Sequence, residues 1–458
     1  MDRDTAEPRV QEMPGEKAEE WAEYHHQHAA TTTYVYDFVW DITADAEGPF
    51  CTDVDGNVLM DFTSHVAAAP LGYNNPKIME PMSELDIVDP NKIAGQDFYF
   101  SGGWPPEEAD IPGPAHLMDR LTDLTSHYDM DRVFLSNSGA EAVENALKLS
   151  YDASDGGKYG FTFEGAFHGR TLGTLSLNRS KEVYRREFPE ISSVHDVPFC
   201  ADSDCDPASC GCGFFPGGAD DSSALRRKLD PDSGHVNPDE VAYIIMEPIQ
   251  GEGGYRPPSD AFMDEIAALT DEHDITLIAD EIQSGVGRTG EMWASDHYAI
   301  EPDIITGAKG LRVGATVGRE ELFPDEKSRL SSTWGAGDVL SSLQGVLTLE
   351  AIEEYDLLDN AVERGRQMTE LVVDADHDSV VDVRGKGLML GVEFDMKERR
   401  DAVVDAALKR GLLTLGCGYK TLRLLPPLDV TEREIALAAE LLFEAIEDVS
   451  DVAAPAND

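Results

Sequence analysis

Basic residues are scarce in this sequence. Its 36 Lys and Arg stand against 89 Asp and Glu, so the formal net charge at pH 7 is −53, and the acids are spread along the whole chain. Such a chain repels phosphate backbones and anionic headgroups, which argues against nucleic acid or a membrane as partner. Because molar salt shortens the Debye length to roughly 3 Å and screens self-repulsion, we expect a halophilic microbe's protein.

Long hydrophobic runs and cysteines are scarce as well. No stretch approaches the roughly 18 consecutive apolar residues of a membrane span, and the start, Met1-Asp2-Arg3-Asp4, lacks a signal-peptide pattern. We therefore expect a cytoplasmic protein, whose six cysteines would not form a disulfide framework. The length of 458 residues, 41% of them hydrophobic, suits one large and one small domain.

The middle of the chain alternates apolar stretches with helical stretches. Continuous hydrophobicity indicates strands buried on both faces, so we expect an α/β fold with a mostly parallel sheet between helices. The predicted strands cover 133–135, 160–163, 241–246, 276–279 and 303–305.

The two ends of the chain predict a smaller α+β domain. We expect residues 1–75 to contribute to it, residues 76–345 to form the large domain, and residues 346–458 to complete the small one. The expected elements are a frayed segment 1–20, a tight hairpin centred on Asp55-Gly56-Asn57, a loop at 200–235, a long helix near 338–372, a hairpin over 380–393 and a helix opening at Thr431 with Glu434 as capping-box partner.

Two predicted strands end in an aspartate and a lysine, Asp280 and Lys309. A lysine amine can hold the aldehyde of pyridoxal phosphate as a Schiff base, and a carboxylate can keep its pyridine nitrogen protonated. The pair alone is also compatible with ordinary strand ends, so other parts of the site are needed.

Other candidate groups follow the predicted strands, where ligand sites of parallel sheets gather. Ser138, Gly139 and Ala140 are expected to begin a helix whose N-terminus could bind a phosphate. An ordinary serine N-cap without a ligand would show the same sequence. Phe167 could stack on a flat ring and Arg170 could grip a carboxylate, the alternative being a core Phe and a surface Arg. A Gly-rich loop bearing two carboxylates, 247–254, is unusual for a plain turn.

Taken together, these stretches resemble a known family. The ordered motifs are SGAEAVENALK, FHGRT, EPIQGEGG, ADEIQSGVGRTG, PDIITGAKG, STWG, VRGKGLMLGVE and LRLLPPL. They closely resemble the class III aminotransferases, fold-type-I pyridoxal phosphate enzymes that include 4-aminobutyrate, ornithine and lysine ω-aminotransferases. The resemblance covers roughly residues 30–445 and implies a homodimer with shared active sites.

The resemblance also implies a role for each matched residue. Lys309 would hold pyridoxal 5′-phosphate covalently, and Asp280 would pair with the pyridine nitrogen. The other implied cofactor contacts are Ser138, Gly139, Ala140, Phe167, His168, Gln283 and, from the partner subunit, Thr333. Arg170 would bind the carboxylate of an ω-amino acid and Arg423 the α-carboxylate of glutamate or 2-oxoglutarate, with Glu252 masking Arg423 when that carboxylate is absent.

The function expected on this basis is transamination of an ω-amino acid similar to 4-aminobutyrate, with 2-oxoglutarate as acceptor. Two alternatives stay open. The run 328–335 looks more like lysine 6-aminotransferases, which favours an ornithine or lysine ω-aminotransferase. The N-terminal run Thr31-Thr32-Thr33, followed by the hairpin, resembles an archaeal branch that includes amino-acid racemases.

Four of the six cysteines, Cys200, Cys205, Cys210 and Cys212, crowd into one loop. Four thiolates could bind zinc or an iron–sulfur cluster. The spacing matches no standard zinc finger, so a plain or redox-sensitive loop is the alternative.

Overall fold

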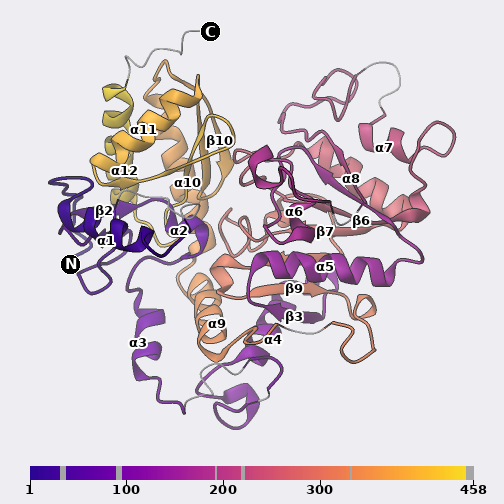
Figure 1. The fold of residues 1–458 in the computed structure, drawn as a ribbon, viewed down its shortest axis with the longest axis horizontal. Helices are drawn as coiled ribbons and strands as arrows, with labels where there is room; N and C mark the ends of the chain where they lie inside the picture. Colours follow the sequence, from indigo (N-terminus) through magenta and orange to yellow (C-terminus); the bar gives the residue numbers. More distant parts are fainter. Residues whose placement is uncertain are drawn as a thin grey trace.

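A seven-stranded sheet forms the centre of the larger body in Figure 1, with the order β3-β9-β8-β7-β6-β4-β5. The computed structural model describes residues 1–30, 38–88, 95–98, 100–190, 193–217, 222–330 and 333–449. The strands are β3 (Arg132–Ser136), β4 (Tyr159–Phe163), β5 (Ser193–Val197), β6 (Val241–Met246), β7 (Thr276–Asp280), β8 (Ile304–Gly307) and β9 (Gly314–Gly318). Only the pairings of β9 are antiparallel, so the predicted mostly parallel sheet is confirmed.

Helices cover both faces of this sheet, which explains the continuous hydrophobicity of its strands. Ile245 and Ile278 pack in the cluster that contains Val143 of α5. Their neighbours Ile244 and Leu277 point to the other face and pack in the cluster of α8. The helices of this body are α4 (Pro114–Leu124), α5 (Gly139–Ala153), α6 (Leu172–Leu175), α7 (Ala224–Leu229), α8 (Asp260–His273) and α9 (Val339–Glu354).

Two smaller sheets lie in the second body, where the indigo N-terminal elements meet the yellow C-terminal helices in Figure 1. One is antiparallel, ordered β10-β11-β14-β13; in the other, β12 pairs in parallel with β2 and so joins the two chain ends. Their strands are β1 (Phe50–Thr52), β2 (Val58–Asp61), β10 (Val380–Lys386), β11 (Met389–Phe394), β12 (Leu412–Leu413), β13 (Leu415–Cys417) and β14 (Thr421–Leu424). The boundaries at residues 75 and 345 stay a prediction.

The remaining helices lie at the two ends of the chain or in short turns. The longer ones are α1 (Glu16–His26), α3 (Pro76–Glu84), α10 (Leu357–Asp374), α11 (Lys397–Lys409) and α12 (Glu432–Asp448), and α2 (Ser64–Ala67) is a single left-handed turn. The 3₁₀ turns are η3 (Pro106–Glu108), η4 (Ser126–Tyr128), η5 (Glu182–Tyr184), η6 (Pro238–Glu240), η7 (Ala294–His297), η8 (Lys309–Leu311) and η9 (Glu320–Leu322). Within the described ranges, no helix is both long and apolar enough to cross a bilayer.

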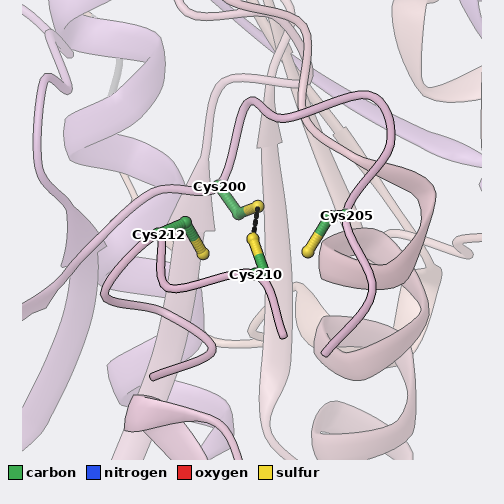
Figure 2. Close-up of side chains that lie close together, drawn as sticks. All are labelled: Cys200, Cys205, Cys210 and Cys212. Carbon is green, nitrogen blue, oxygen red and sulfur yellow. Dashed lines mark hydrogen bonds between the residues drawn. The ribbon is translucent and has the colours of Figure 1, made fainter. Parts of the chain in front are cut away.

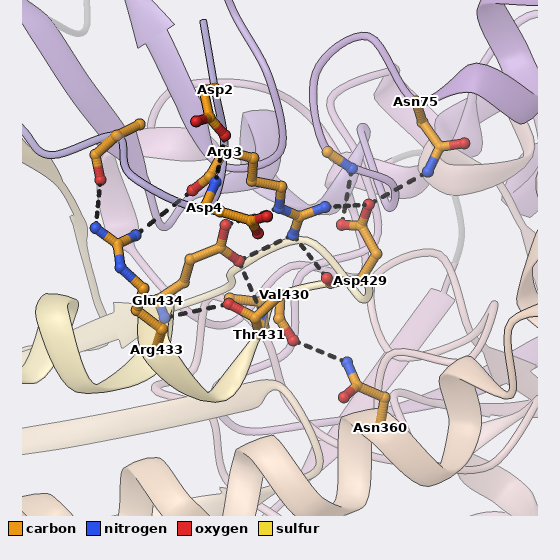
Figure 3. A network of polar contacts seen from close by, with 12 residues as sticks. Asp2, Arg3, Asp4, Asn75, Asn360, Asp429, Val430, Thr431, Arg433 and Glu434 are labelled. Carbon is orange, nitrogen blue, oxygen red and sulfur yellow. Dashed lines mark hydrogen bonds and ion pairs between the residues drawn. The ribbon is translucent and has the colours of Figure 1, made fainter.

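The N-terminal segment is ordered, contrary to the expectation that residues 1–20 fray. Arg3 donates to the carboxylates of Glu434 at 2.7 Å and Asp429 at 3.2 Å, in the network of Figure 3. Further on, the Asp55 carboxylate accepts from the backbone N–H groups of Lys17 and Ala18, both at 2.9 Å, at the start of α1. Arg3 therefore attaches the start of the chain to α12 and the residues just before it, and Asp55 attaches the start of α1 to the loop between β1 and β2.

Three other expectations need correction. The hairpin around Gly56 is confirmed, but its loop is wide: Thr52 pairs with Val58, and the Asp53 carboxylate accepts from the N–H groups inside the loop. The long helix is two helices, because the chain turns at Asp356 with φ +52°. The 200–235 loop contains α7. Thr31–Thr33 and Ser331–Ser332 lie outside the described residues.

Candidate active site

A cavity of about 380 Å³ lies at the carboxyl ends of β4, β6, β7 and β8. Most of the residues predicted from the strand ends meet there. The predicted residues that line it are Ser138, Gly139, Ala140, Phe167, His168, Glu252, Asp280, Gln283 and Lys309. Arg170, Arg423 and Thr333 are not part of the lining, but each contacts a residue that is: Phe167, Glu252 and Asn137, respectively.

Lys309 follows β8 and begins η8. Its φ of +48° lies in the left-handed region, which residues other than glycine rarely adopt. Desolvation and, to a lesser extent, Arg423 lower the pKa of its amine, Glu252 and Asp280 raise it, and the net result is a pKa of about 8. A lysine with a lowered pKa is neutral often enough near neutral pH to act as a nucleophile or base.

Asp280 ends β7 and is buried beside His168. The carboxylate lies 2.7 Å from His168 Nδ1 and also accepts from Thr306 Oγ1 at 3.3 Å. Among the described residues, His168 Nε2 and Gln283 Oε1 are buried without a hydrogen-bond partner. Buried polar atoms are rarely left unsatisfied, so these two favour a polar ligand in the cavity.

The N-terminus of α5 forms one wall of the cavity. Ser138 is the N-cap and accepts from Glu141 N at 3.3 Å. Gly139 and Ala140 are the first helical residues, whose N–H groups have no partner within the helix and favour an anion. A side chain at Gly139 would meet Ile282 at 2.7 Å, so glycine fits the close packing there.

Glu252 and Arg423 form an ion pair between the two bodies. Arg423 Nη1 lies 2.6 Å from Glu252 Oε1, and Arg423 as a whole is 7% exposed. Burial alone would raise the pKa of Glu252, but Arg423 and Lys181 outweigh it and lower the pKa. Lys181 lies 3.5 Å from the same carboxylate. The pairing expected between Glu252 and Arg423 is therefore present.

Arg170 and Phe167 lie at the rim of the cavity. The Arg170 guanidinium is exposed and lies 5.7 Å from the centre of the Phe167 ring and 5.0 Å from that of Tyr184. An arginine held by two rings and open to solvent can still receive a carboxylate.

Thr333 lies near α5, outside the cavity. Its hydroxyl is exposed, accepts from Asn137 Nδ2 at 2.7 Å and donates to Glu141 at 3.0 Å. The expected contribution of Thr333 to a partner's site stays a prediction, because the structure contains one chain.

Glu247 lies in the predicted Gly-rich loop but was not among the individual residues predicted for the site. Glu247 lines the cavity, where burial and then Asp280 raise the pKa of its carboxyl to about 7 against the effect of His168. It accepts from the N–H groups of Phe167 at 2.9 Å and Gly251 at 2.8 Å, and so joins two loops. Its place in the EPIQGEGG motif was a signal, since that loop carries two carboxylates.

A family model described as Aminotransferase class-III matches residues 36–446. The chain belongs to the class III aminotransferases. Acetylornithine aminotransferase of Synechocystis sp. is 34% identical over 425 residues, 88% of this chain and 88% of that protein. An alanine/serine racemase of Pyrococcus horikoshii is 32% identical over 422 residues, 88% of this chain and 84% of that protein.

Solved structures agree with this assignment. A lysine aminotransferase from M. tuberculosis matches with a TM-score of 0.79 and 27% identity, over 94% of this chain and 99% of that chain. An ornithine aminotransferase from Toxoplasma gondii matches with a TM-score of 0.77 over 95% of this chain and 96% of that chain; at 22% identity it shows the fold alone. The expected fold-type-I architecture is confirmed.

Class III aminotransferases use pyridoxal 5′-phosphate, and the cavity of this aminotransferase fits that group. The fit rests on three observations: a buried carboxylate at Asp280, an anion-favouring helix N-terminus at Gly139, and the unpartnered polar atoms of His168 and Gln283. The four clustered cysteines are absent from the cavity lining and lie apart, in the loop after β5.

Proposed function

We propose that this aminotransferase moves the distal amino group of an ω-amino acid of the ornithine, acetylornithine or lysine type to 2-oxoglutarate. The observation that carries the proposal is the Glu252–Arg423 ion pair beside Lys309. Acetylornithine and lysine aminotransferases among the relatives favour such a donor over the 4-aminobutyrate expected from the sequence.

The ion pair reconciles two substrates with different charge layouts. An ω-amino donor has no carboxylate next to its reacting carbon, so Arg423 would face that carbon unpaired unless Glu252 covers it. Glutamate and 2-oxoglutarate carry a carboxylate there and would replace Glu252. The released carboxylate would keep Lys181 as a partner, 3.5 Å away. The donor's own carboxylate would reach the exposed guanidinium of Arg170 at the rim.

The cofactor would be held by residues at the ends of three strands, β3, β4 and β7. Gly139 and Ala140 would receive its phosphate, Phe167 would cover the ring, and Asp280 would keep the ring nitrogen protonated. His168 would fix the orientation of the Asp280 carboxylate, 2.7 Å from its Nδ1. When bound, pyridoxal phosphate supplies an electron sink that makes the substrate's C–H bond acidic.

Lys309 would perform the proton transfers. Its amine, once free of the cofactor, would take the proton from the substrate carbon that carries the amino group and would return it to the carbon on the other side of that nitrogen. A pKa lowered to about 8 suits both directions of this transfer near neutral pH. Glu247, protonated or charged near pH 7, would hold the Phe167 and Gly251 loops in place.

We also propose a homodimer that works in a salt-loaded cytoplasm. Trp334, 70% exposed, packs edge-to-face on Phe98, 52% exposed, at a centroid distance of 5.0 Å. An exposed aromatic pair next to Thr333 suits a docking surface for a second copy. Sedimentation in molar salt, comparing wild type with Trp334→Ser, tests the dimer.

Glu252→Gln tests the proposed function. An uncovered Arg423 in a closed site costs on the order of a few kcal/mol, and each 2.7 kcal/mol is roughly 10²-fold in rate. The loss should fall on the half-reaction with the ω-amino donor and largely spare the one with glutamate. Each half-reaction is followed separately by the pyridoxal-to-pyridoxamine absorbance change.

Glu182→Gln is the matched control, because Glu182 is exposed near the same entrance and lies in η5. Equal losses with both substrates would contradict the proposal. The racemase named among the relatives gives the competing outcome. A D-amino acid that appears without any pyridoxamine form would replace transamination by racemisation.

A further inference from the structure

The four cysteines of the loop after β5 come together in space. Cys200 is buried, and Cys205, Cys210 and Cys212 are partly exposed. Their four sulfur atoms all lie within 4.8 Å of one another, and Cys200 Sγ is 3.8 Å from Cys210 Sγ. Figure 2 shows the four side chains converging from different parts of the loop.

This spacing fits a single metal ion. Sulfurs at the corners of a tetrahedron with Zn–S bonds of about 2.3 Å lie roughly 3.8 Å apart. A disulfide needs sulfurs about 2.05 Å apart, far shorter than the 3.8 Å between Cys200 and Cys210. An iron–sulfur cluster inserts several irons and sulfides between its thiolates and needs a wider cage than this one.

Two glycines shape the turn of the loop that brings the cysteine side chains together. Gly211 and Gly213 have φ values of +65° and +90°, which glycine adopts without strain. A side chain at Gly211 would meet nothing within 4 Å, so backbone conformation, and not space, accounts for glycine there. The turn brings Cys210 and Cys212, two residues apart, to one centre.

The sulfurs also have hydrogen-bond donors around them. Ser259 Oγ donates to Cys200 Sγ at 3.3 Å, and the Phe215 N–H donates to Cys212 Sγ at 3.4 Å. Such outer contacts orient thiolate ligands and stabilise their charge. Ser259 is the N-cap of α8, so the site is attached to a helix that packs on the central sheet.

We propose that each chain binds one Zn²⁺ through Cys200, Cys205, Cys210 and Cys212. Four protein ligands leave no open position, so the site is structural and not catalytic. Binding releases the four thiol protons to solvent and stabilises a loop with little secondary structure of its own.

The site also borders the active-site loop. Cys212 and Asp202 share a second cavity with Gly253, which belongs to the Gly-rich loop of Glu252, and with Arg256, which follows that loop. The ion would therefore stabilise the cysteine loop that lies next to the Gly-rich loop. Its loss should make the Gly-rich loop more mobile without removing any cofactor contact.

Elemental analysis of the whole enzyme, purified without oxygen or chelator in molar salt, tests the proposal. We expect about one zinc per chain in the wild type and in Cys51→Ala, whose cysteine lies in β1. The double variant Cys210→Ser/Cys212→Ser should lose the zinc but keep the pyridoxal phosphate absorbance, which shows that it is folded.

A thiol titration covers the case in which the double variant does not fold. A mercurial reagent added to the wild type should release zinc in step with the reaction of four thiols. Wild type without zinc after incubation with ZnCl₂, stoichiometric iron, or zinc retained by the double variant would each overturn the proposal. A mass showing a disulfide within the loop of anaerobically purified protein would do the same.

Discussion

Lys309 is set among groups of both charge signs, and its pKa depends on all of them. Desolvation and Arg423 disfavour the ammonium form, whereas Glu252, Asp280 and Glu247 favour it. The result is a pKa of about 8, well below that of a free lysine. Residues around Lys309 therefore tune both its nucleophilicity and the pH at which it can act.

Lys309→Ala should abolish turnover while the protein still binds pyridoxal phosphate through α5 and Asp280. Loss of a positioned acid–base group alone costs roughly 10²–10⁴-fold, and the covalent attachment is lost as well. Borohydride reduction followed by peptide mass analysis should label Lys309 in the wild type and no lysine in the variant. Lys148→Ala, on the exposed side of α5, is the control. Label on another lysine would contradict the assignment.

The pH profile of the donor half-reaction should rise with pH and level off near pH 8. Lys309 acts as a base only when neutral, so below its pKa the rate falls about tenfold per pH unit. Glu252→Gln removes a carboxylate that raises the pKa of Lys309, so the inflection should move to lower pH. Stopped-flow absorbance between pH 6 and pH 10 measures both profiles; a shift to higher pH would count against this arrangement.

At the scale of elements, the sequence predicted the strands that are buried on both faces. β6 and β7 read as continuous apolar runs because α5 and α8 cover them. β5 and β9 were missed for physical reasons. β5 is an edge strand of mixed polarity that, among the described residues, pairs with β4 alone. β9 has glycine at both ends and runs opposite to its neighbours.

The candidate site likewise contains residues that could be predicted from the sequence and contacts that could not. Groups after β7 and β8 could be predicted, because parallel strands bring their carboxyl ends to one edge. The Glu252–Arg423 contact joins a loop to β14 of the other body, and only the family resemblance predicted it. The hydrogen bond between His168 and Asp280 depends on how β4, β6 and β7 are aligned, which the sequence pattern does not encode.

The start of α12 gives a prediction at this scale. Thr431 accepts from Glu434 N at 3.3 Å, and Glu434 accepts in return from Thr431 N at 2.8 Å, as the sequence predicted. Thr431→Ala should lower the free energy of unfolding by about 1 kcal/mol. Denaturant unfolding in molar salt measures it, with Thr369→Ala inside α10 as the control. Equal stability of the two variants would show that the cap contributes nothing.

At the scale of the whole molecule, the net negative charge affects stability more than any single ion pair does. The basic side chains are distributed among many acidic partners, as at Arg132, which contacts Asp131 and Glu320. Exposed pairs of this kind contribute at most about 1 kcal/mol each. They do not offset the mutual repulsion of a formal net charge of −53 in dilute solution.

The protein should therefore be least stable in dilute buffer and should gain stability in molar potassium chloride. The Debye length falls from about 10 Å at 0.1 M to about 3 Å at 1 M, so repulsion between neighbouring acids is screened. Because about 1 kcal/mol shifts the Tm of a large domain by roughly 2–4 °C, we expect a rise of several degrees. Calorimetry in potassium chloride measures it, with sucrose of equal osmolarity as the control for solvent exclusion. Equal Tm values in dilute and molar salt, or an equal rise in sucrose, would contradict the halophilic interpretation.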